Sequence, residues 1–252
     1  MSEWSAFRDA LRFLTRLPVP SADHLADDWL ARAAKYFPAV GLLVGLASAL
    51  VLLVASRIWL GLVPAILAVA ASVALTGAFH EDGLGDTFDG LGGGSTIARR
   101  LEIMKDSRIG TYGALALVFG TLLRIAPLAL LSPPLAACAL LAAHACGRGA
   151  GVVVMNAVPH AGDPSVTKVM YGRGAIAPAE IAVAIFICGV SLVPIVMLVP
   201  KAAAVGVVAG AVLAAVVVRQ ARRLIGGSTG DILGAVEQAF EIGFLLGVAA
   251  VR

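Results

Sequence analysis

Long apolar stretches alternate with short polar ones along most of this chain. Each stretch approaches the roughly 20 mostly apolar residues that a transmembrane helix needs. Seven spans are predicted, at 37–56, 60–79, 112–131, 135–155, 180–199, 202–218 and 232–251. Proline-containing breaks at 132–134 and 200–201 supply two of the turns. The pattern predicts an all-α, polytopic membrane helix bundle, built as a single domain over residues 1–252.

Composition agrees with a bundle of this kind. Of the 252 residues, 60% are hydrophobic and 14% are charged, whereas a soluble domain is about half apolar and about a quarter charged. That excess excludes a water-soluble core, and it also excludes a disordered chain. The 28 glycines allow helices to pack closely. Such small-residue surfaces also permit a homo-oligomer.

Positive charge gathers on one side of the predicted bundle. Seven spans place residues 1–36 and the loops 80–111, 156–179 and 219–231 on that side, with 14 of the 19 Lys and Arg residues. The positive-inside rule makes this side cytoplasmic, so the N-terminus is expected in the cytoplasm and the protein in the inner membrane. Residues 3–17 predict an amphipathic helix, which either lies on the membrane surface or caps the bundle.

An acidic cluster lies where the second predicted span meets the cytoplasm. Glu81, Asp82, Asp86 and Asp89 fall within nine residues. If the helix continues there, the three aspartates lie within roughly 60° of one another, at about 100° per residue. Carboxylates packed so closely repel unless they are protonated or neutralised by a cation, and their oxygens suit Mg²⁺ or Mn²⁺. The loop 80–111 is therefore the predicted catalytic loop, and a solvated loop without a role is the alternative.

Glycines and bases follow these acids. Gly92 and Gly93 belong to a triple-glycine segment whose backbone N–H groups can surround an anion. Lys105 and Arg108, with Asp106 between them, can hold phosphate oxygens. The glycine segment alone is a weak signal, because such segments are often plain linkers.

Four charged residues fall inside or at the edge of the later spans. Asp231 opens the last span, Glu237 and Glu241 follow within it, and Arg148 lies in the fourth. A charge at the bilayer centre costs about 2.5–3.5 kcal/mol on insertion scales, so these groups are expected to face the bundle interior or a wet cavity. Arg148 is expected to pair with the acids or to hold a substrate phosphate. Asp231 is either a simple helix N-terminal charge or part of a second acidic site.

Together, metal-binding acids, clustered bases and glycine-rich segments at one face fit phosphoryl transfer assisted by a divalent ion. The location at a membrane surface suggests that one substrate is amphiphilic or is made at the membrane. Residue types and spacing lead no further than this reaction class.

Residues 81–94 and 100–113 closely resemble the signature of the cobalamin synthase family. Residues 13–20 and 227–235 match the family as well, so the resemblance covers almost the whole chain. One mild departure is Gly85, where the family most often has Ala.

The resemblance implies adenosylcobinamide-GDP ribazoletransferase activity. A ribose hydroxyl of α-ribazole, or of its 5′-phosphate, would attack the cobinamide-side phosphorus of adenosylcobinamide-GDP, and GMP would leave. Mg²⁺ is the expected cofactor. The expected partners are the corrinoid nucleotide, the α-ribazole substrate and membrane lipid, and no nucleic acid is expected.

Under this interpretation carboxylates carry the chemistry, and bases and glycines bind substrate. The expected metal ligands are Glu81, Asp82, Asp86 and Asp89, with Asp231 as an alternative to Glu81. The expected catalytic set is Asp82, Asp86, Asp89 and Asp231, with one outer carboxylate as the base. The expected substrate-binding set is Lys105, Asp106, Arg108, Arg148, Gly92 and Gly93.

Two other functions compete with this one. A CDP-alcohol phosphotransferase of lipid synthesis also places aspartates in helical register around a divalent ion. Residues 86–90 match the opening of its motif, but Gly93 and Gly94 replace the Ala-Arg pair and no later Asp pair follows. An ion-coupled transporter would use the charged residues of the later spans as an ion path. Against it, the acids concentrate in one loop and no inverted repeat is visible.

Overall fold

The computed structural model describes residues 2–20, 28–161 and 174–251. Within these residues the regular structure is helical, apart from one isolated β-bridge between His160 and Ser228. The helices are α1 (Glu3–Leu14), α2 (Trp29–Ala34), α3 (Phe37–Ala55), α4 (Leu62–Thr76), α5 (Phe79–Gly93), α6 (Ile97–Met104), α7 (Thr111–Leu130), α8 (Pro133–Ala157), α9 (Pro178–Leu198), α10 (Pro200–Ile225) and α11 (Gly230–Ala250).

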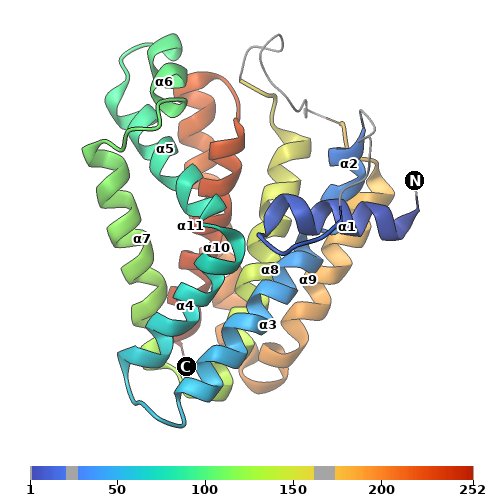
Figure 1. Cartoon of the computed structure of the whole chain (residues 1–252), viewed down its shortest axis with the longest axis vertical. Helices are drawn as coiled ribbons and strands as arrows, with labels where there is room; N and C mark the ends of the chain where they lie inside the picture. Colours follow the sequence, from blue (N-terminus) through green and yellow to red (C-terminus); the bar gives the residue numbers. More distant parts are fainter. Residues whose placement is uncertain (1, 21–27, 162–173, 252) are drawn as a thin grey trace.

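The long helices form a bundle with α11 at its centre (Figure 1). In the 18-residue apolar stretch of α11, 83% of the residues are buried, against 17% in the corresponding stretch of the peripheral α9. Glycines let α11 approach its neighbour α10, because the backbone of Gly247 lies directly against that of Gly206. Close backbone contact through small residues is typical of membrane helices, which gain little from apolar burial against one another.

The predicted all-α membrane bundle is confirmed. Six described helices, α3 and α7 to α11, are long and apolar enough to cross a membrane, and the bent pair α4–α5 makes a seventh candidate. The last span was the one most interrupted by charge, yet it is the most buried, because its acids face basic residues inside the bundle. Part of the loop predicted at 156–179, residues 162–173, lies outside the described residues.

The second predicted span is wrong as a continuous helix over 60–79. Helix α4 ends at Thr76, and α5 begins at Phe79 after a bend of 90°. The two connecting residues, Gly77 and Ala78, both have left-handed backbone conformations, with φ of 67° and 59°. Hydropathy does not mark this bend, because Phe79, the first residue after it, is still apolar and the polar residues begin only at His80.

The N-terminal segment packs against the bend. The N–H of Arg16 donates to the carbonyl of Leu75 at 2.8 Å, and the Arg16 side chain lies where a Cβ of residue 77 would be. Glycine at position 77 therefore serves two needs, the positive φ and the close approach of Arg16. The acidic residues consequently begin a separate helix, α5, and do not lie in an extended loop.

The predicted amphipathic N-terminal helix is α1, which lies across the upper part of α3 (Figure 1). Ala6, Ala10 and Leu14 are buried against the bundle, and Trp4 is 69% exposed. The helix thus caps one end of the bundle with its apolar face. Its far side remains available to a membrane surface, so both predicted roles are compatible with the packing.

Candidate active site

Helix α5 sorts the four predicted acids into two groups. Asp82 is exposed and Asp86 is half-buried, whereas Glu81 and Asp89 are buried. The helical register predicted for the three aspartates is present, since residues 79–93 form one helix. The exposed or half-buried acids and the buried acids nevertheless have different surroundings, and the two groups contact different residues.

Glycines bring the start of α11 against α5. A Cβ on Gly83 would come within 2.9 Å of the main-chain oxygen of Asp231, and within 3.3 Å of the Cα of Gly234. The two helices therefore cross with their backbones in contact. This crossing places Asp231, a residue distant in sequence, beside the exposed end of the α5 acids.

Asp82, Asp86 and Asp231, which we call the open carboxylates, lack a counter-charge in the described part of the chain. Asp82, Asp89 and Asp231 lie close enough to Asp86 for their charges to act on it. Among the described residues, no basic side chain forms an ion pair with Asp82, Asp86 or Asp231. Asp231 receives a hydrogen bond of 3.4 Å from the hydroxyl of Thr229. Negative charge is thus concentrated here without a basic partner in the described part of the chain.

Asp89 has a different environment from Asp82 and Asp86. Its two carboxylate oxygens accept hydrogen bonds from the backbone N–H groups of Gly110, at 2.7 Å, and Gly113, at 2.8 Å. These N–H groups lie at the start of α7, where a carboxylate also interacts favourably with the helix dipole. Asp89 therefore fastens the beginning of α7 to α5.

Glu81 points into the bundle. Its Oε1 is 2.8 Å from Nη2 of Arg124 on α7, and both side chains are buried. The structure thus does not bring Glu81 together with the open carboxylates. Its partner was not foreseen from the sequence, because nothing in the spacing of residues 81 and 124 reveals that their helices meet.

A buried network of charges continues from this pair along α11. Arg148 on α8 donates to Glu237 at 2.6 Å and approaches Glu241 at 3.5 Å, and Arg124 lies 3.5 Å from Glu241. The pairing of Arg148 with the acids of the last span is the first of the two predicted alternatives. It explains how α11 keeps two glutamates in the centre of a membrane bundle.

His144, Glu237 and Glu241 also form a group that could hold a metal. Their ligand atoms lie within 4.8 Å of one another, and all three residues are buried. His144 Nδ1 is in direct contact with Glu241. The guanidinium of Arg148 already supplies positive charge to both glutamates. This group therefore has a counter-charge, unlike the carboxylates at the crossing.

The predicted glycine segment is helical where it contains Gly92 and Gly93. Both belong to the last turn of α5, and the ring of Tyr112 lies so close to Gly92 that a Cβ there would be 2.9 Å from it. Gly93 has room for a side chain, with Ile103 3.6 Å from its Cβ position. Gly92 thus allows α7 to pack on α5, and anion binding by the segment stays a prediction.

Lys105, Asp106 and Arg108 lie in the turn between α6 and α7. Arg108 donates twice to the Asp106 carboxylate, from Nη2 at 2.6 Å and from Nε at 3.0 Å. These hydrogen bonds lower the pKa of Asp106 to about 2. Lys105 is exposed at the C-terminal cap of α6. The turn therefore presents two basic side chains to solvent, one of them already paired.

Comparison with known proteins places this chain in a family. The family model described as cobalamin-5-phosphate synthase matches residues 6–249. The chain belongs to the cobalamin-5-phosphate synthase family. The relatives are similar over nearly their whole length, and no solved structure matches the chain.

Two relatives illustrate the extent of the similarity. The adenosylcobinamide-GDP ribazoletransferase of Bradyrhizobium diazoefficiens is 47% identical over 97% of this chain and 93% of its own length. The enzyme of the same name from Azorhizobium caulinodans is 46% identical over 95% of this chain and 93% of its own. The resemblance seen in the signature segments is thus confirmed over the full chain.

Proposed function

We propose that this member of the cobalamin-5-phosphate synthase family performs its reaction at the crossing of α5 and α11. Full-length homology gives it adenosylcobinamide-GDP ribazoletransferase activity. The location rests on one observation: Asp82, Asp86 and Asp231 lie together without a basic partner in the described part of the chain. The chain is a multi-pass membrane protein.

In the proposed reaction a ribose hydroxyl of α-ribazole, or of its 5′-phosphate, attacks the cobinamide-side phosphorus of adenosylcobinamide-GDP. A P–O bond to the ribose forms while the P–O bond to GMP breaks. The hydroxyl proton passes to one of the three open carboxylates, and GMP leaves with the displaced electron pair. The products are GMP and the completed corrinoid nucleotide.

The open carboxylates fit a magnesium ion better than the buried group does. Mg²⁺ prefers oxygen ligands, keeps several waters and is usually bound through one or two carboxylates plus substrate phosphates. Asp82 is exposed and Asp86 half-buried, so water and a phosphate can reach them. The group of His144, Glu237 and Glu241 is buried, and both of its glutamates are already ion-paired with Arg148. We therefore assign the ion to Asp86 together with Asp82 or Asp231, which leaves the third carboxylate to accept the proton. Glu81 is left out because it is paired with Arg124.

When bound, the ion would neutralise the diphosphate and stabilise the leaving GMP. Lys105 and Arg108 are proposed to hold outer phosphate oxygens, with Asp106 setting the orientation of the Arg108 guanidinium. Asp89 supports this arrangement indirectly, because it fixes the start of α7, which follows the turn carrying these bases. Gly93, which has room beside it, is proposed as an approach surface for the phosphate, whereas the ring of Tyr112 covers Gly92.

The proposed membrane is the cytoplasmic one, with the α5–α6 end facing the cytoplasm. Helix α6 and the C-terminal end of α10 lie at the same end of the bundle (Figure 1), joined by a 3.3 Å hydrogen bond from Arg100 to the Leu224 carbonyl. Both carry arginines, as the positive-inside rule requires of a cytoplasmic face. Cytosolic substrates would then reach the acids directly.

The test is GMP release by the purified full chain in detergent, supplied with Mg²⁺, adenosylcobinamide-GDP and α-ribazole phosphate. We expect GMP in proportion to the corrinoid product, no release after EDTA, and recovery when Mg²⁺ is restored. Turnover of a CDP-linked lipid without any GMP would contradict the proposed function. EDTA-insensitive GMP release would contradict the assignment of the ion.

A further inference from the structure

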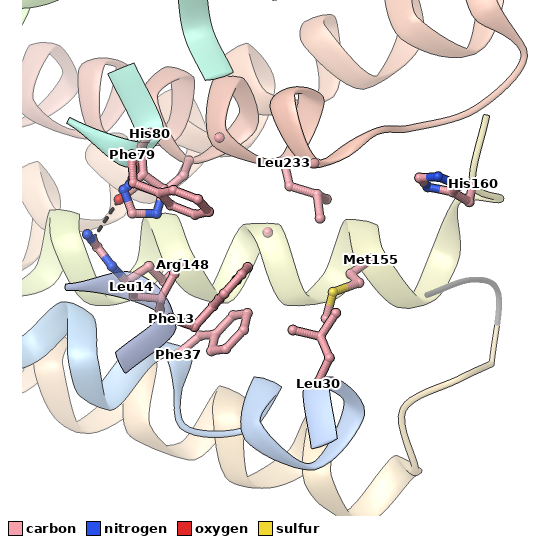
Figure 2. Close-up of a pocket in the computed structure, with 14 residues that line it drawn as sticks. Phe13, Leu14, Leu30, Phe37, Phe79, His80, Arg148, Met155, His160 and Leu233 are labelled. Atoms are coloured by element: carbon pink, nitrogen blue, oxygen red, sulfur yellow. Dashed lines mark hydrogen bonds and ion pairs between the residues drawn. The ribbon is translucent and has the colours of Figure 1, made fainter. Parts of the chain in front are cut away.

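Three phenylalanine rings border a cavity of about 240 Å³. Phe13, Phe37 and Phe79 form one wall, and Leu14, Leu30, Met155 and Leu233 add aliphatic lining (Figure 2). The Phe13 ring stacks on Phe37 with centroids 5.8 Å apart and meets Phe79 edge-on at 5.2 Å. Such walls favour a flat aromatic guest, because rings pack both face-on and edge-on.

Polar groups occupy separate ends of this cavity. Arg148 and His80 lie at one end and His160 at the other (Figure 2). The Arg148 side chain is only 3% exposed, and its Nε has no hydrogen-bond partner among the described residues. A buried donor left without a partner costs free energy unless something accepts from it. The cavity therefore suits an aromatic ring that carries an acceptor atom.

The cavity adjoins the open carboxylates along both helices that form the crossing. On α11, Gly230 and Gly234 line the cavity while Asp231, between them, faces the acids of α5. On α5, Phe79 and His80 line it just before Asp82. A molecule with an aromatic part and a sugar can thus lie across the crossing, with the sugar near the acids.

The volume of the cavity limits the size of the molecule that it can bind. Pockets for drug-sized ligands measure about 300–1,000 Å³, so 240 Å³ is too small for a corrin ring or a whole nucleotide. A bicyclic aromatic base is of suitable size. The guanine and adenine of the corrinoid nucleotide are also bicyclic, but the edges of guanine and adenine carry several polar groups that this mostly apolar lining would leave unpaired. The benzimidazole of the ribazole has a single free ring nitrogen that can accept a hydrogen bond.

We infer that this cavity is the subsite for the benzimidazole base of the ribazole substrate, an inference that rests on the proposed function. The three phenylalanines hold the faces and edges of the ring. Arg148 Nε–H donates to the free ring nitrogen. The glycosidic bond then directs the ribose toward Asp231 and its neighbours.

The first test fills the cavity. Met155→Phe and Leu233→Phe should each raise KM for α-ribazole phosphate at least tenfold, while KM for adenosylcobinamide-GDP stays within twofold. Ala215→Phe is the matched control, because it adds the same ring to a different groove, between α8 and α10. Unchanged KM for the ribazole substrate in both folded variants would overturn the inference while leaving the proposed function intact.

The second test measures binding of the base alone, without turnover. Titration calorimetry should show that 1,5,6-trimethylbenzimidazole binds the purified protein, and that 1,5,6-trimethylindole, which lacks the acceptor nitrogen, binds at least tenfold more weakly. Binding of the base should persist in Asp82→Asn and disappear in Met155→Phe. Equal affinity for the two compounds, or a tightly bound lipid that occupies the cavity and excludes both, would overturn the inference. A failure of the proposed function would instead appear as wild-type protein that releases no GMP.

Discussion

Two groups of acids on the same pair of helices have opposite surroundings. Glu81, Glu237 and Glu241, the ion-paired group, are buried and pair with Arg124 and Arg148 at distances down to 2.6 Å. At the crossing of α5 and α11, the open group of Asp82, Asp86 and Asp231 has no basic partner among the described residues. Within residues 2–20, 28–161 and 174–251, basic side chains thus pair with the acids inside the bundle and not with those at the crossing, where a ligand is expected to bring the positive charge.

This contrast separates structural from functional charge. Removing one member of a neutralised buried pair leaves an uncompensated charge, which is strongly destabilising. Removing one of several repelling carboxylates relieves repulsion, so the ligand-free protein should become more stable. Removing one charge is therefore expected to destabilise the ion-paired group and to stabilise the open carboxylates.

The largest effect is expected on catalysis from the open group. Asp82→Asn and Asp86→Asn should each lower the rate of GMP release on the order of 10³-fold, because each removes a carboxylate proposed to hold the ion or to accept the proton. Their thermal midpoints without metal should equal or exceed that of the wild type. Rates within a factor of ten of the wild type in both variants would contradict the assignment.

The next largest effect is expected on stability, from a substitution in the ion-paired group. Arg124→Met should cost about 3–5 kcal/mol by leaving Glu81 buried and unpaired, measured as a lower thermal midpoint in detergent. The double variant Glu81→Gln with Arg124→Met removes both charges and should recover much of the loss. A single variant as stable as the wild type would show that the pair does not neutralise this part of the bundle.

A smaller effect is expected where the two helices cross. Gly83→Ala would place a Cβ 2.9 Å from the Asp231 carbonyl oxygen, and overpacking of this kind costs about 1–3 kcal/mol. Gly85→Ala, on the same helix, meets only Leu117 at 3.6 Å and should gain up to about 1 kcal/mol from helix propensity. Loss of activity only in Gly83→Ala would show that the crossing holds Asp231 in position, and equal behaviour of the two variants would argue against it.

The smallest effect concerns Asp106, which lies outside both groups. Its pKa is lowered to about 2 by Arg108, so its contribution to stability is present above the unfolded value of 3.8 and is lost as the pH falls toward 2. Between pH 5 and 8, Asp106→Asn should therefore leave the pH dependence of the thermal midpoint unchanged. A new pH dependence in that interval would place Asp106 in contact with another titrating group.

Much of the fold was predictable because hydropathy reports burial in lipid directly. The predicted spans 37–56 and 112–131 differ from α3 and α7 by single residues. The bend before α5 was not predictable, because it depends on Arg16 packing against Gly77 from a distant part of the chain. Local sequence shows a glycine there, and glycine alone does not specify a 90° turn.

The candidate site was predictable in its residue types and less so in its partners. Helical spacing placed Asp82 and Asp86 together. The cost of burying charge indicated that Arg148 would meet either the acids of the last span or a substrate phosphate, and it meets the acids. Spacing could not reveal that Asp89 binds the start of α7, or that Glu81 turns inward to Arg124. Those partners depend on how helices pack, which one sequence does not state.

Metal binding by the open group tests the central claim most directly. Mn²⁺ serves as a paramagnetic substitute for Mg²⁺, and the loss of its free-ion electron paramagnetic resonance signal measures binding to purified protein without substrate. We expect Asp86→Asn to weaken binding at least tenfold, and His144→Gln, which changes the buried group, to leave it within twofold of the wild type. The reverse result, with affinity kept in Asp86→Asn and lost in His144→Gln, would place the ion in the buried group and contradict the account.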